Sequence, residues 1–529
     1  MLEAMPYLQR PLRRLLAGAD AATNRLYGWR YNPLYHSGAL VVALFAVLLV
    51  TGIYLLFLYR IGAPYVSIVR ITDQVWLGRW MRGLHRYASD AAVVAVAFHS
   101  LRMFVQGRSW GPRTLAWVSG LILLFVTFVC GWTGFVMVWD VQGQVLAQAG
   151  ARLLDLIPIF SEPISRAFTG ERALPGAFFF LNLFAHVALP IGLGILLWVH
   201  VSRVARPALL PPRRLMWGVI GLLLALAVAW PVTITPSADL FALPGPAPYD
   251  VFYAFWLPAA RVLGPQGAWA LGLVLSAVAL AVPWWTRPSR SHRPPVSVVD
   301  ERLCTGCEQC YLDCPYEAIA MVERTPADVA DGRSTEVARV DPARCVSCGI
   351  CAGSCAPMGV GPEGRTGRAQ LSTVRAFTVA RRPSGQDVVI VACERGAGGI
   401  AAGAEFDGAP VYPVSCGGNL HTSVIEYLLR AGAGGVLVVS CPPRDCCNRE
   451  GPKWLEQRMY HNREAELRDR VDRRRVHLTH AAEGERWRVR AELQAARATI
   501  AALEAAAAES DIVLEELCEI PTAPAEVRR

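Results

Sequence analysis

Long apolar runs fill the first 290 residues of the chain, and short polar segments containing arginine separate them. A membrane-spanning helix needs about 20 consecutive, mostly apolar residues. By this measure the pattern predicts six transmembrane helices, near residues 37–59, 84–105, 113–139, 177–203, 214–233 and 266–286.

The pattern changes after the linker TRPSRSHRPP at 286–295. Residues 300–358 contain eight cysteines, and from about residue 386 short β-branched runs alternate with helical periodicity, which is typical of an α/β domain. An arginine-rich stretch at 463–475 predicts a helix with a solvated face, and the Ala/Glu/Arg-rich stretch at 484–508 predicts another helix.

These changes predict a multidomain protein with four parts. They are an all-α transmembrane bundle of about six helices at 1–290, a cysteine-rich domain at 291–372, an α/β domain with a parallel sheet at 373–500 and a C-terminal tail at 501–529.

Composition agrees with a large membrane-embedded part, because 53% of the 529 residues are hydrophobic and only 18% are charged. The net charge of +9 comes mainly from arginines that flank apolar runs, which favours membrane orientation over nucleic-acid binding. Arginines gather in the N-terminal segment and in loops 106–112 and 204–213, whereas loop 234–265 has only Arg261. The positive-inside rule therefore places both termini and the cysteine-rich region on the cytoplasmic side of a prokaryotic inner membrane.

Two predicted helices each carry a pair of histidines 14 residues apart, His85 with His99 and His186 with His200. Fourteen residues of α-helix rise about 21 Å and return to within roughly 40° of the same face. Because both helices cross the membrane in the same direction, His85 is expected level with His186, and His99 level with His200. An imidazole in hydrocarbon is costly unless something satisfies it, and two imidazoles at one level are the axial ligands of a low-spin b-type haem.

Glycine pairs with the same 14-residue spacing stand in two further helices, Gly38 with Gly52 and Gly120 with Gly134. Glycine lets a flat ring approach the backbone closely. Small residues are also common where membrane helices pack, but four pairs with one spacing favour space for two haems.

We call the four histidines and four glycines of these pairs the ladder. Two arginines stand three residues from a histidine of the ladder, since Arg82 precedes His85 and Arg102 follows His99. They would suit haem propionates. The alternative is that either side chain extends along apolar surface to place its charge at the membrane interface.

At these residues the chain resembles cytochrome b of the quinol-oxidising cytochrome bc complexes, over about residues 30–260. The segments WTGFVMVWD at 132–140 and PSADLFALPGPAPYDVFYAFWL at 236–257 also carry the resemblance. It implies two stacked haems b and quinone sites near each membrane face. The family has Pro-Glu-Trp-Tyr at its outer site, whereas this chain has Pro-Tyr-Asp-Val at 248–251, so we expect quinone to react mainly near the inner haem.

The motif C-x2-C-x2-C-x3-C-P occupies residues 304–315, and its cysteine spacing recurs at 345–357 with one residue inserted before the proline. This doubled spacing resembles bacterial two-cluster ferredoxins, in which each 4Fe-4S cluster takes its fourth cysteine from the other motif. The resemblance implies a ferredoxin-like domain with one cluster on Cys304, Cys307, Cys310 and Cys355 and another on Cys345, Cys348, Cys351 and Cys314. Zinc is the alternative metal, which eight cysteines in this arrangement disfavour.

More cysteines follow three predicted strands: Cys393 after VVIVA, Cys416 after VYPVS, and Cys441, Cys446 and Cys447 after GVLVVS. The carboxyl ends of parallel strands meet at one edge of a sheet, where such sheets bind ligands. Buried free cysteines, which are common in protein cores, are the alternative.

Over about residues 386–500 the chain resembles the small iron–sulfur (delta) subunit of methyl-viologen-reducing hydrogenases, including AAEGERW at 481–487. The resemblance implies one 2Fe-2S cluster and a link to heterodisulfide-reductase-type flavoproteins. The family has Cys-x-x-Cys at its first site, where this chain has a cysteine followed by Gly396. The expected ligands are therefore Cys393, Cys416, Cys441 and Cys446, with Cys447 as a substitute.

The order of these sites predicts an electron path from haems in the membrane through two 4Fe-4S clusters to a binuclear cluster. Because the sequence has no nucleotide-binding fingerprint, flavin motif or nickel-site cysteine pattern, we expect the electron-transfer subunit of a quinone-linked oxidoreductase complex. Expected partners are membrane lipid, quinone and a soluble flavoprotein that oxidises NAD(P)H or resembles heterodisulfide reductase. A homodimer is compatible with the sequence, and nucleic acid is not expected.

Two other functions stay open at this point. One is a membrane anchor and electron wire without its own quinone site. The other is a quinol-oxidising subunit of cytochrome bc type, which the absence of a Rieske Cys-x-His pattern from the sequence disfavours.

Overall fold

Residues 26–292 pack with the first 13 residues into one unit of the computed structural model, and residues 293–529 pack with residues 14–25 into a second. The structure describes the chain except residues 1–8, 159–161, 169–173, 175, 203–206, 243–247, 288–293, 327–328, 330–331, 462 and 519–529, and it describes side chains as far as residue 507. Helix α1 (Gln9–Tyr31) is kinked at Gly28 and contributes residues to both units.

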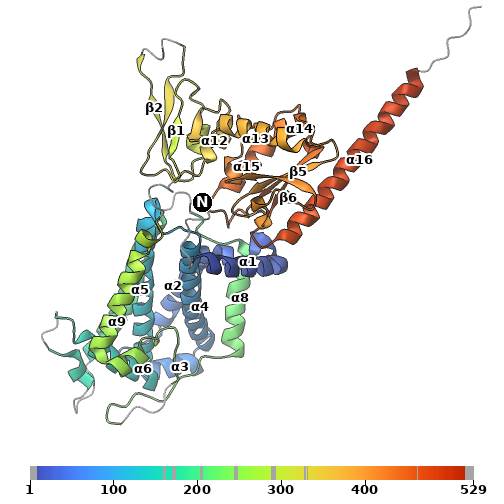
Figure 1. The fold of residues 1–529 in the computed structure, drawn as a ribbon. Helices are drawn as coiled ribbons and strands as arrows, with labels where there is room; N and C mark the ends of the chain where they lie inside the picture. Colours follow the sequence, from blue (N-terminus) through green and yellow to red (C-terminus); the bar gives the residue numbers. More distant parts are fainter. Residues whose placement is uncertain are drawn as a thin grey trace, which may run out of the picture. The chain divides into compact units, whose positions relative to one another are not determined.

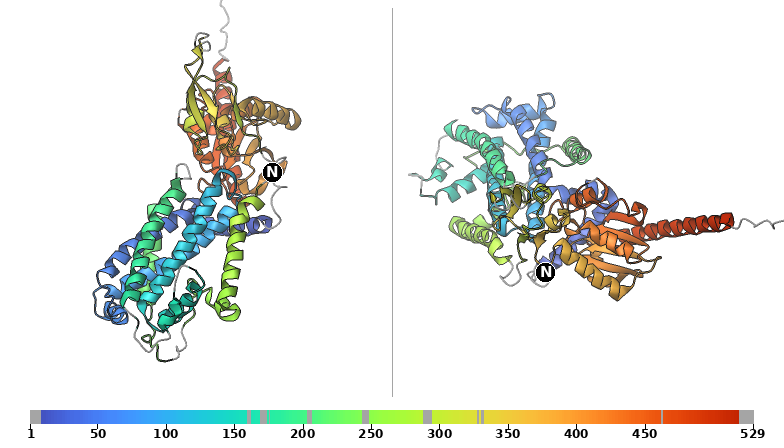
Figure 2. Two further views of the ribbon diagram at one scale, coloured as in Figure 1. Left: turned by 90° about the vertical axis from the view of Figure 1, so that its left-hand side faces the viewer. Right: turned by 90° about the horizontal axis from the view of Figure 1, so that it is seen from above.

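The first unit is helical. Its longer described elements are α2 (Ser37–Leu56), α3 (Pro64–Asp73), α4 (Gly78–Val105), α5 (Thr114–Val138), α6 (Val141–Leu154), α7 (Gly176–Ser202), α8 (Arg213–Ala229) and α9 (Leu257–Trp285). Helix α2 packs along α4 and α5 packs along α7, so the two predicted histidine helices each lie against a predicted glycine helix (Figures 1 and 2).

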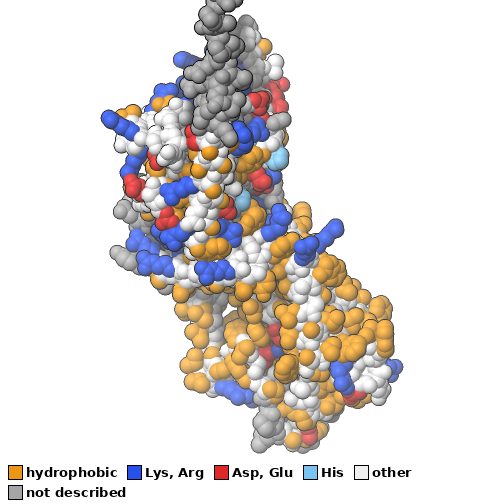
Figure 3. Space-filling model, turned by 90° about the vertical axis from the view of Figure 1, so that its right-hand side faces the viewer, with side chains coloured by type: hydrophobic (Ala, Val, Ile, Leu, Met, Phe, Trp, Pro, Cys, Tyr) orange, Lys and Arg blue, Asp and Glu red, His pale blue; other side chains and the backbone are white. Residues whose placement is uncertain are grey.

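Five stretches of the described residues are long and apolar enough to cross a membrane: Pro33–Leu56, Gly78–Val105, Gly111–Val138, Gly176–Ser202 and Leu257–Trp285. Large apolar side chains such as Phe125 and Trp198 are 63% and 72% exposed. Figure 3 shows hydrophobic side chains over most of the visible face of this unit. Such a surface is typical of contact with lipid. The remaining predicted span, 214–233, corresponds to α8, which has 17 residues and does not fall in this group.

The described residues of the cysteine-rich part of the second unit include two antiparallel strand pairs and two short helices. Strand β1 (Ser297–Val299) pairs with β4 (Val360–Pro362), and β2 (Ile319–Glu323) pairs with β3 (Glu336–Val340). The helices are α10 (Gln309–Leu312) and α12 (Ile350–Ser354), each inside one of the two cysteine motifs. The ferredoxin-like assignment of this part stays a prediction.

The α/β part contains one five-stranded sheet in the order β6-β7-β5-β8-β9. The strands are β5 (Val388–Cys393), β6 (Glu405–Phe406), β7 (Ala409–Val414), β8 (Gly435–Ser440) and β9 (Val476–His480). The last four strands in that order are parallel, but β6 runs antiparallel to β7, so the sheet is mixed and the predicted purely parallel sheet is wrong at this edge. A tight turn at residues 407–408 joins β6 directly to β7, which permits antiparallel pairing without a crossover helix.

Helices cover both faces of this sheet. On one face α13 (Gly367–Arg381), α14 (Thr422–Arg430) and α15 (Gly451–Tyr460) bury Val374, Ile425 and Leu455. On the other face α16 (Arg486–Cys518) buries Val489 and Leu493. Since both faces are covered, β5 and β8 consist entirely of buried residues.

Two predictions about the C-terminal part need correction. The arginine-rich stretch 463–475 is not a helix apart from the short η7 (Arg473–Arg475), and Arg463 is mostly buried because it pairs with Asp313. The predicted boundary at residue 500 lies inside α16, where Ile500 belongs to the core.

Candidate functional site

The four histidines of the ladder lie on α4 and α7. The ring centroids of His85 and His186 are 6.4 Å apart, with the rings tilted by 59°. A ring nitrogen lies about 1.1 Å from the ring centre and a metal–nitrogen bond is about 2 Å long, so two rings that share a metal have centroids about 6 Å apart. The spacing of His85 and His186 fits one iron between them. His99 and His200 are likewise neighbours.

Each predicted glycine faces one of these histidines. A Cβ atom added to the glycine would lie 2.9 Å from His99 at Gly38, 3.3 Å from His85 at Gly52, 3.3 Å from His200 at Gly120 and 3.0 Å from His186 at Gly134. Real Cβ atoms essentially never come closer than 3.0 Å to another heavy atom, and contacts between 3.0 and 3.4 Å are uncommon. The structure therefore brings together the histidines and glycines that share a level. Because glycine has no side chain, there is room beside each imidazole.

Hydroxyl groups orient three of the imidazoles, which the sequence reasoning missed. The hydroxyl oxygens of Thr51, Ser119 and Thr133 lie 2.8, 3.0 and 3.0 Å from Nδ1 of His85, His200 and His186 respectively. Each of these residues directly precedes a glycine of the ladder, and Ser37 likewise precedes Gly38. This Ser/Thr-Gly dipeptide was the available sequence signal.

The same hydroxyls fix the tautomer of the rings. Thr51 donates its hydroxyl hydrogen to the carbonyl oxygen of Val47 at 2.7 Å, and Ser119 donates to that of Leu115 at 2.8 Å. Their oxygens then accept a hydrogen from Nδ1 of the histidine, which leaves Nε2 with a free lone pair. Orientation of a ligating histidine through its other nitrogen is the usual arrangement at metal sites.

The two predicted propionate arginines are both engaged within the protein. Arg82 donates to the carbonyl oxygen of Val232. Arg102 is only 3% exposed, and its guanidinium lies 4.8 Å from the ring centre of Tyr35. Arg102 is thus buried and Arg82 is half-buried, and their role toward a haem stays a prediction.

A buried ionic group near the start of α4 was also missed. Arg86 pairs with Asp90 at 3.0 Å and with Asp250, and its guanidinium lies 4.3 Å from the ring centre of Phe135. The other oxygen of Asp250 accepts the backbone N–H groups of Phe252 at 3.0 Å and of the next residue at 2.6 Å. Both oxygens of Asp250 are therefore already used in holding the chain.

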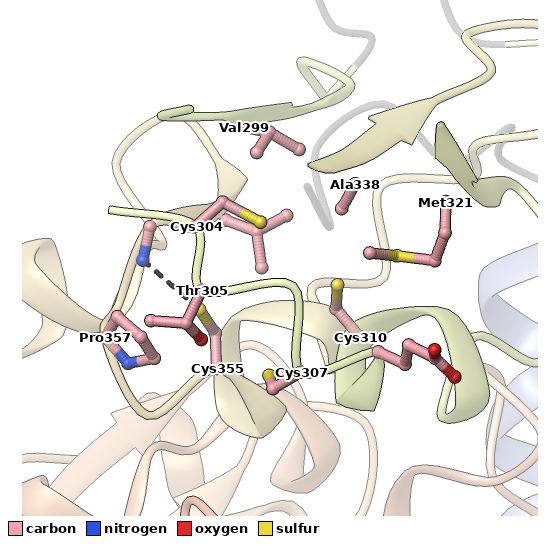
Figure 4. A pocket seen from close by; sticks show the side chains of 12 residues that line it. Val299, Cys304, Thr305, Cys307, Cys310, Met321, Ala338, Cys355 and Pro357 are labelled. Atoms are coloured by element: carbon pink, nitrogen blue, oxygen red, sulfur yellow. Dashed lines mark hydrogen bonds between the residues drawn. The ribbon is translucent and has the colours of Figure 1, made fainter. Parts of the chain in front are cut away.

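The first cysteine motif surrounds a pocket (Figure 4). The pocket holds about 360 Å³ of space free of protein atoms, part of it open to solvent. Cys304, Cys307, Cys310 and Cys355 all line it, and these are the four ligands expected for one cluster. The backbone N–H of Gly359 donates to Sγ of Cys355 at 3.3 Å.

The other four cysteines of the two motifs form a second group. Burial raises the pKa of the Cys351 thiol to about 12, and the neighbouring Cys314 and Cys345 also raise it. Burial likewise raises the pKa of Cys348 well above its usual value, next to the same three cysteines. Buried thiols do not ionise readily by themselves, and metal ions bind the thiolate form, so this group fits a cluster that supplies positive charge.

Four further cysteines converge at the carboxyl ends of adjacent strands. Cys393 ends β5, Cys416 follows β7 and Cys441 follows β8, and with Cys446 all are at most 3% exposed. The thiols of Cys441 and Cys393, of Cys441 and Cys446, and of Cys416 and Cys446 are hydrogen-bonding neighbours. A Cβ at Gly451 would lie 3.0 Å from Sγ of Cys416 and 3.2 Å from Sγ of Cys446. Glycine at position 451 thus lets the start of α15 pack directly against these cysteines.

Two details favour this set of four over the alternatives. A Cβ at Gly396 would lie 2.7 Å from Cβ of Cys441 and 2.9 Å from the carbonyl oxygen of Ala481. The second cysteine of a Cys-x-x-Cys pair therefore has no space there. Cys447 is only half-buried and accepts a hydrogen bond from Arg395 at 3.6 Å.

Among the described residues, no three Cys, His, Asp or Glu side chains form the geometry of a single bound metal ion. The cysteines whose side chains the structure describes are all free thiols. Their grouping into sets of four is what supports cluster binding.

Three family models match the chain, in the order that the motifs predicted. They are cytochrome b/b6/petB at residues 24–230, the 4Fe-4S dicluster domain at 303–359 and the methyl-viologen-reducing hydrogenase delta subunit at 388–504.

Curated relatives match the helical unit. The menaquinol:cytochrome c reductase cytochrome b subunit of Geobacillus thermodenitrificans is 26% identical over 192 residues, which is 34% of this chain and 86% of that protein. Cytochrome b6 of Mastigocladus laminosus is 25% identical over 197 residues, 37% of this chain and 92% of that protein. A solved structure described as a hyperthermophilic respiratory Complex III is 18% identical with a TM-score of 0.40, covering 49% of this chain and 78% of that one, a likeness too low to support an argument.

The chain therefore joins three recognised segments in sequence: a cytochrome b/b6 segment, a 4Fe-4S dicluster segment and a hydrogenase delta-subunit segment.

Proposed function

We propose that this chain is the membrane electron-transfer subunit of a quinone-linked oxidoreductase complex, passing electrons between membrane quinone and a soluble flavoprotein. The observation that carries the proposal is the arrangement of four histidines in two levels, each histidine facing a glycine. Curated relatives of this segment are named as a menaquinol:cytochrome c reductase subunit and as cytochrome b6.

Two haems b would supply one-electron transfer at these levels. His85 and His186 would hold one haem, and His99 and His200 the other, with Nε2 of each ring as the ligand atom. The hydroxyls of Thr51, Ser119 and Thr133 hold Nδ1, and Arg82 and Arg102 would meet the propionates.

In the second unit, two 4Fe-4S clusters and one 2Fe-2S cluster would supply the remaining electron carriers. The three sets of four cysteines described above would hold them. Their grouping in fours supports cluster binding over a core of free cysteines, because a bound cluster stabilises the thiolate form that burial disfavours.

Quinone is proposed to react mainly near the inner haem, between His99 and His200. A general base for quinol must have a free oxygen to accept a proton. Asp250, which stands where the outer site would be, is paired with Arg86 and accepts two backbone N–H groups, so it is poorly placed for that task.

The soluble partner is proposed to be a flavoprotein that oxidises NAD(P)H or resembles heterodisulfide reductase. The match to a hydrogenase delta subunit supports a soluble redox partner at the second unit.

We further propose that α8 is a sixth membrane crossing and that the second unit lies in the cytoplasm. Within the second unit, Arg25 lies 5.3 Å from the ring centre of Trp487, and a Cβ at Gly484 would meet the carbonyl oxygen of Ala17 at 2.7 Å. Both ends of the chain then lie on one side of the membrane, which requires an even number of crossings. A helix of 17 residues is about 25 Å long, which is near the lower limit for a span.

The test is the cofactor content and quinone reactivity of the purified protein. We expect two haems b and about ten non-haem irons per chain, with both haems oxidised by a menaquinone analogue after chemical reduction. One haem per chain, or iron near eight, would contradict the cofactor assignment. Full cofactor content without haem oxidation by quinone would favour the membrane anchor and wire over a quinone-reactive subunit.

A further inference from the structure

Arg458 in α15 is fully buried, and it bonds to two segments that carry cluster cysteines. Its Nη1 donates to Oγ of Ser354 at 2.8 Å and to the carbonyl oxygen of Ile350 at 3.4 Å. Its Nη2 donates to the carbonyl oxygen of Gly418 at 2.7 Å. One cation therefore joins α12, which contains Cys351, to the turn that directly follows Cys416.

The two segments are in close contact around this arginine. Asn419 donates to the carbonyl oxygen of Gly349 at 2.9 Å, and the Nε2 of His421 lies 3.2 Å from the carbonyl oxygen of Cys355. A Cβ at Gly353 would lie 2.6 Å from Nη2 of Arg458 and 2.7 Å from the carbonyl oxygen of Gly418. At Gly353 no further side chain fits between α12 and the turn, and Arg458 lies near both Cys351 and Cys416, so the second 4Fe-4S site and the binuclear site are neighbours.

The nearby carboxylate of Asp313 pairs with a second arginine, Arg463, and not with Arg458. Asp313 is fully buried, accepts a hydrogen bond from Ser354 at 2.6 Å and pairs with Arg463 at 2.5 Å. The Ser354 hydroxyl links this carboxylate to Arg458, so two arginines and one carboxylate lie together with one positive charge in excess. Burial lowers the pKa of Arg458 to about 10, so its side chain is still a cation at neutral pH.

Burying an arginine with incomplete ionic pairing destabilises the folded protein unless a nearby anion compensates its charge. Thiolate-ligated iron–sulfur clusters are anionic, and local charge and hydrogen bonds set their reduction potentials. A cluster becomes more negative when it takes up an electron, so a buried cation beside it stabilises the reduced form.

On this basis we propose that Arg458 is a positioning residue that fixes the Cys314/Cys345/Cys348/Cys351 cluster against the binuclear cluster and raises the reduction potentials of both. An electron that leaves one of the two clusters is taken up by the other, with no bond made or broken. The inference rests on the proposed presence of these clusters.

The experiment is an anaerobic redox titration of the full-length purified protein, followed by low-temperature EPR. In Arg458→Met both clusters should shift to more negative midpoint potentials, whereas Arg458→Lys, which retains the charge, should shift them much less. Arg474→Met is the matched control, because Arg474 is largely exposed and pairs with Asp472, and it should leave both potentials unchanged.

Asp313→Asn provides a second measurement if Arg458→Met fails to assemble its clusters. Removing the buried anion leaves both arginines in place, so the adjacent 4Fe-4S potential should shift in the positive direction. Unchanged potentials in Arg458→Met or Asp313→Asn with full iron content would overturn the inference, as would equal shifts in the Lys and Met variants. A wild-type protein that lacks these EPR signals would instead overturn the proposed function.

Discussion

At the scale of single residues, each level of the membrane site depends on a glycine and a hydroxyl next to it in the sequence. At the His186 level, the backbone of Gly134 leaves space beside the ring, and Thr133 holds Nδ1. The glycine provides room and the hydroxyl sets the tautomer. Because outer hydrogen bonds of this kind orient metal-binding histidines, a substitution at either position should act through one haem and leave the other intact.

Gly134→Leu should remove the haem proposed between His85 and His186. A Cβ at this glycine already lies 3.0 Å from the histidine ring, so a larger side chain must displace it. Haem per chain should fall by about half in the pyridine haemochrome assay. Gly192→Leu in α7 is the control, because a Cβ there meets no atom within 4 Å, and it should retain both haems. Equal haem content in the two variants would contradict the assignment.

Adjacent cysteines should differ in their importance for the binuclear cluster. Cys446 is 2% exposed among the converging thiols, whereas Cys447 is turned to Arg395. Cys446→Ser should therefore abolish the 2Fe-2S EPR signal, and Cys447→Ser should leave it close to wild-type intensity. The two 4Fe-4S signals serve as the internal reference in both variants. Loss of the binuclear signal only in Cys447→Ser would exchange the roles of the two residues.

At the scale of elements, the α/β part depends on helices that cover both faces of its sheet. Helix α16 contributes Val489, Leu493 and Ile500 to the core under one face. The carboxyl ends of β5, β7 and β8 hold the cysteine group. Helix α16 packs against one face of the sheet and so stabilises the strands that carry these cysteines. Cluster stability should therefore depend on a helix that carries none of the proposed ligands.

Leu493→Ala tests this dependence. The Leu493 side chain is fully buried, and truncating such a leucine costs about 2–5 kcal/mol. For a unit of this size the loss should lower the temperature at which iron–sulfur absorbance disappears by roughly 5–15 °C. Val379→Ala in α13 is a matched truncation at a side chain that is 73% exposed, and it should shift that temperature by at most a few degrees. Similar temperatures for both variants would show that α16 does not support the cluster region.

At the scale of the whole molecule, the chain separates into a lipid-facing helical unit and a second unit with the cysteine sets. The second unit also includes residues 14–25, which precede all of the membrane spans. The cysteine-rich and α/β parts are joined inside this unit by the buried contacts of Arg458 and by the Arg463–Asp313 pair. We therefore expect them to fold together and not as independent domains.

Topology reporters should establish whether α8 crosses the membrane. With six crossings, alkaline phosphatase fused after Ser237 should be active outside the cytoplasm, and a fusion after Thr286 should be inactive. Fusions after Ser109 and Asp155 calibrate the inner and outer sides, because their positions precede α8. An inactive fusion at Ser237 together with an active one at Thr286 would instead indicate five crossings.

The sequence by itself determined the features that depend on spacing within one segment. The three family segments and their order could be predicted because helix periodicity and cysteine loops are local properties of the backbone. The histidine and glycine positions followed from the same 14-residue period.

The tertiary structure decided the features that depend on segments far apart in the chain. Arg463 looked like part of a solvated helix, yet it bonds to Asp313, 150 residues away. Arg458 likewise meets Ser354 across 104 residues, and β6 forms an antiparallel edge of the sheet, joined to β7 by a short turn. Nothing in local spacing encodes such partners, because only the packing of distant elements determines which buried charges and strand edges meet.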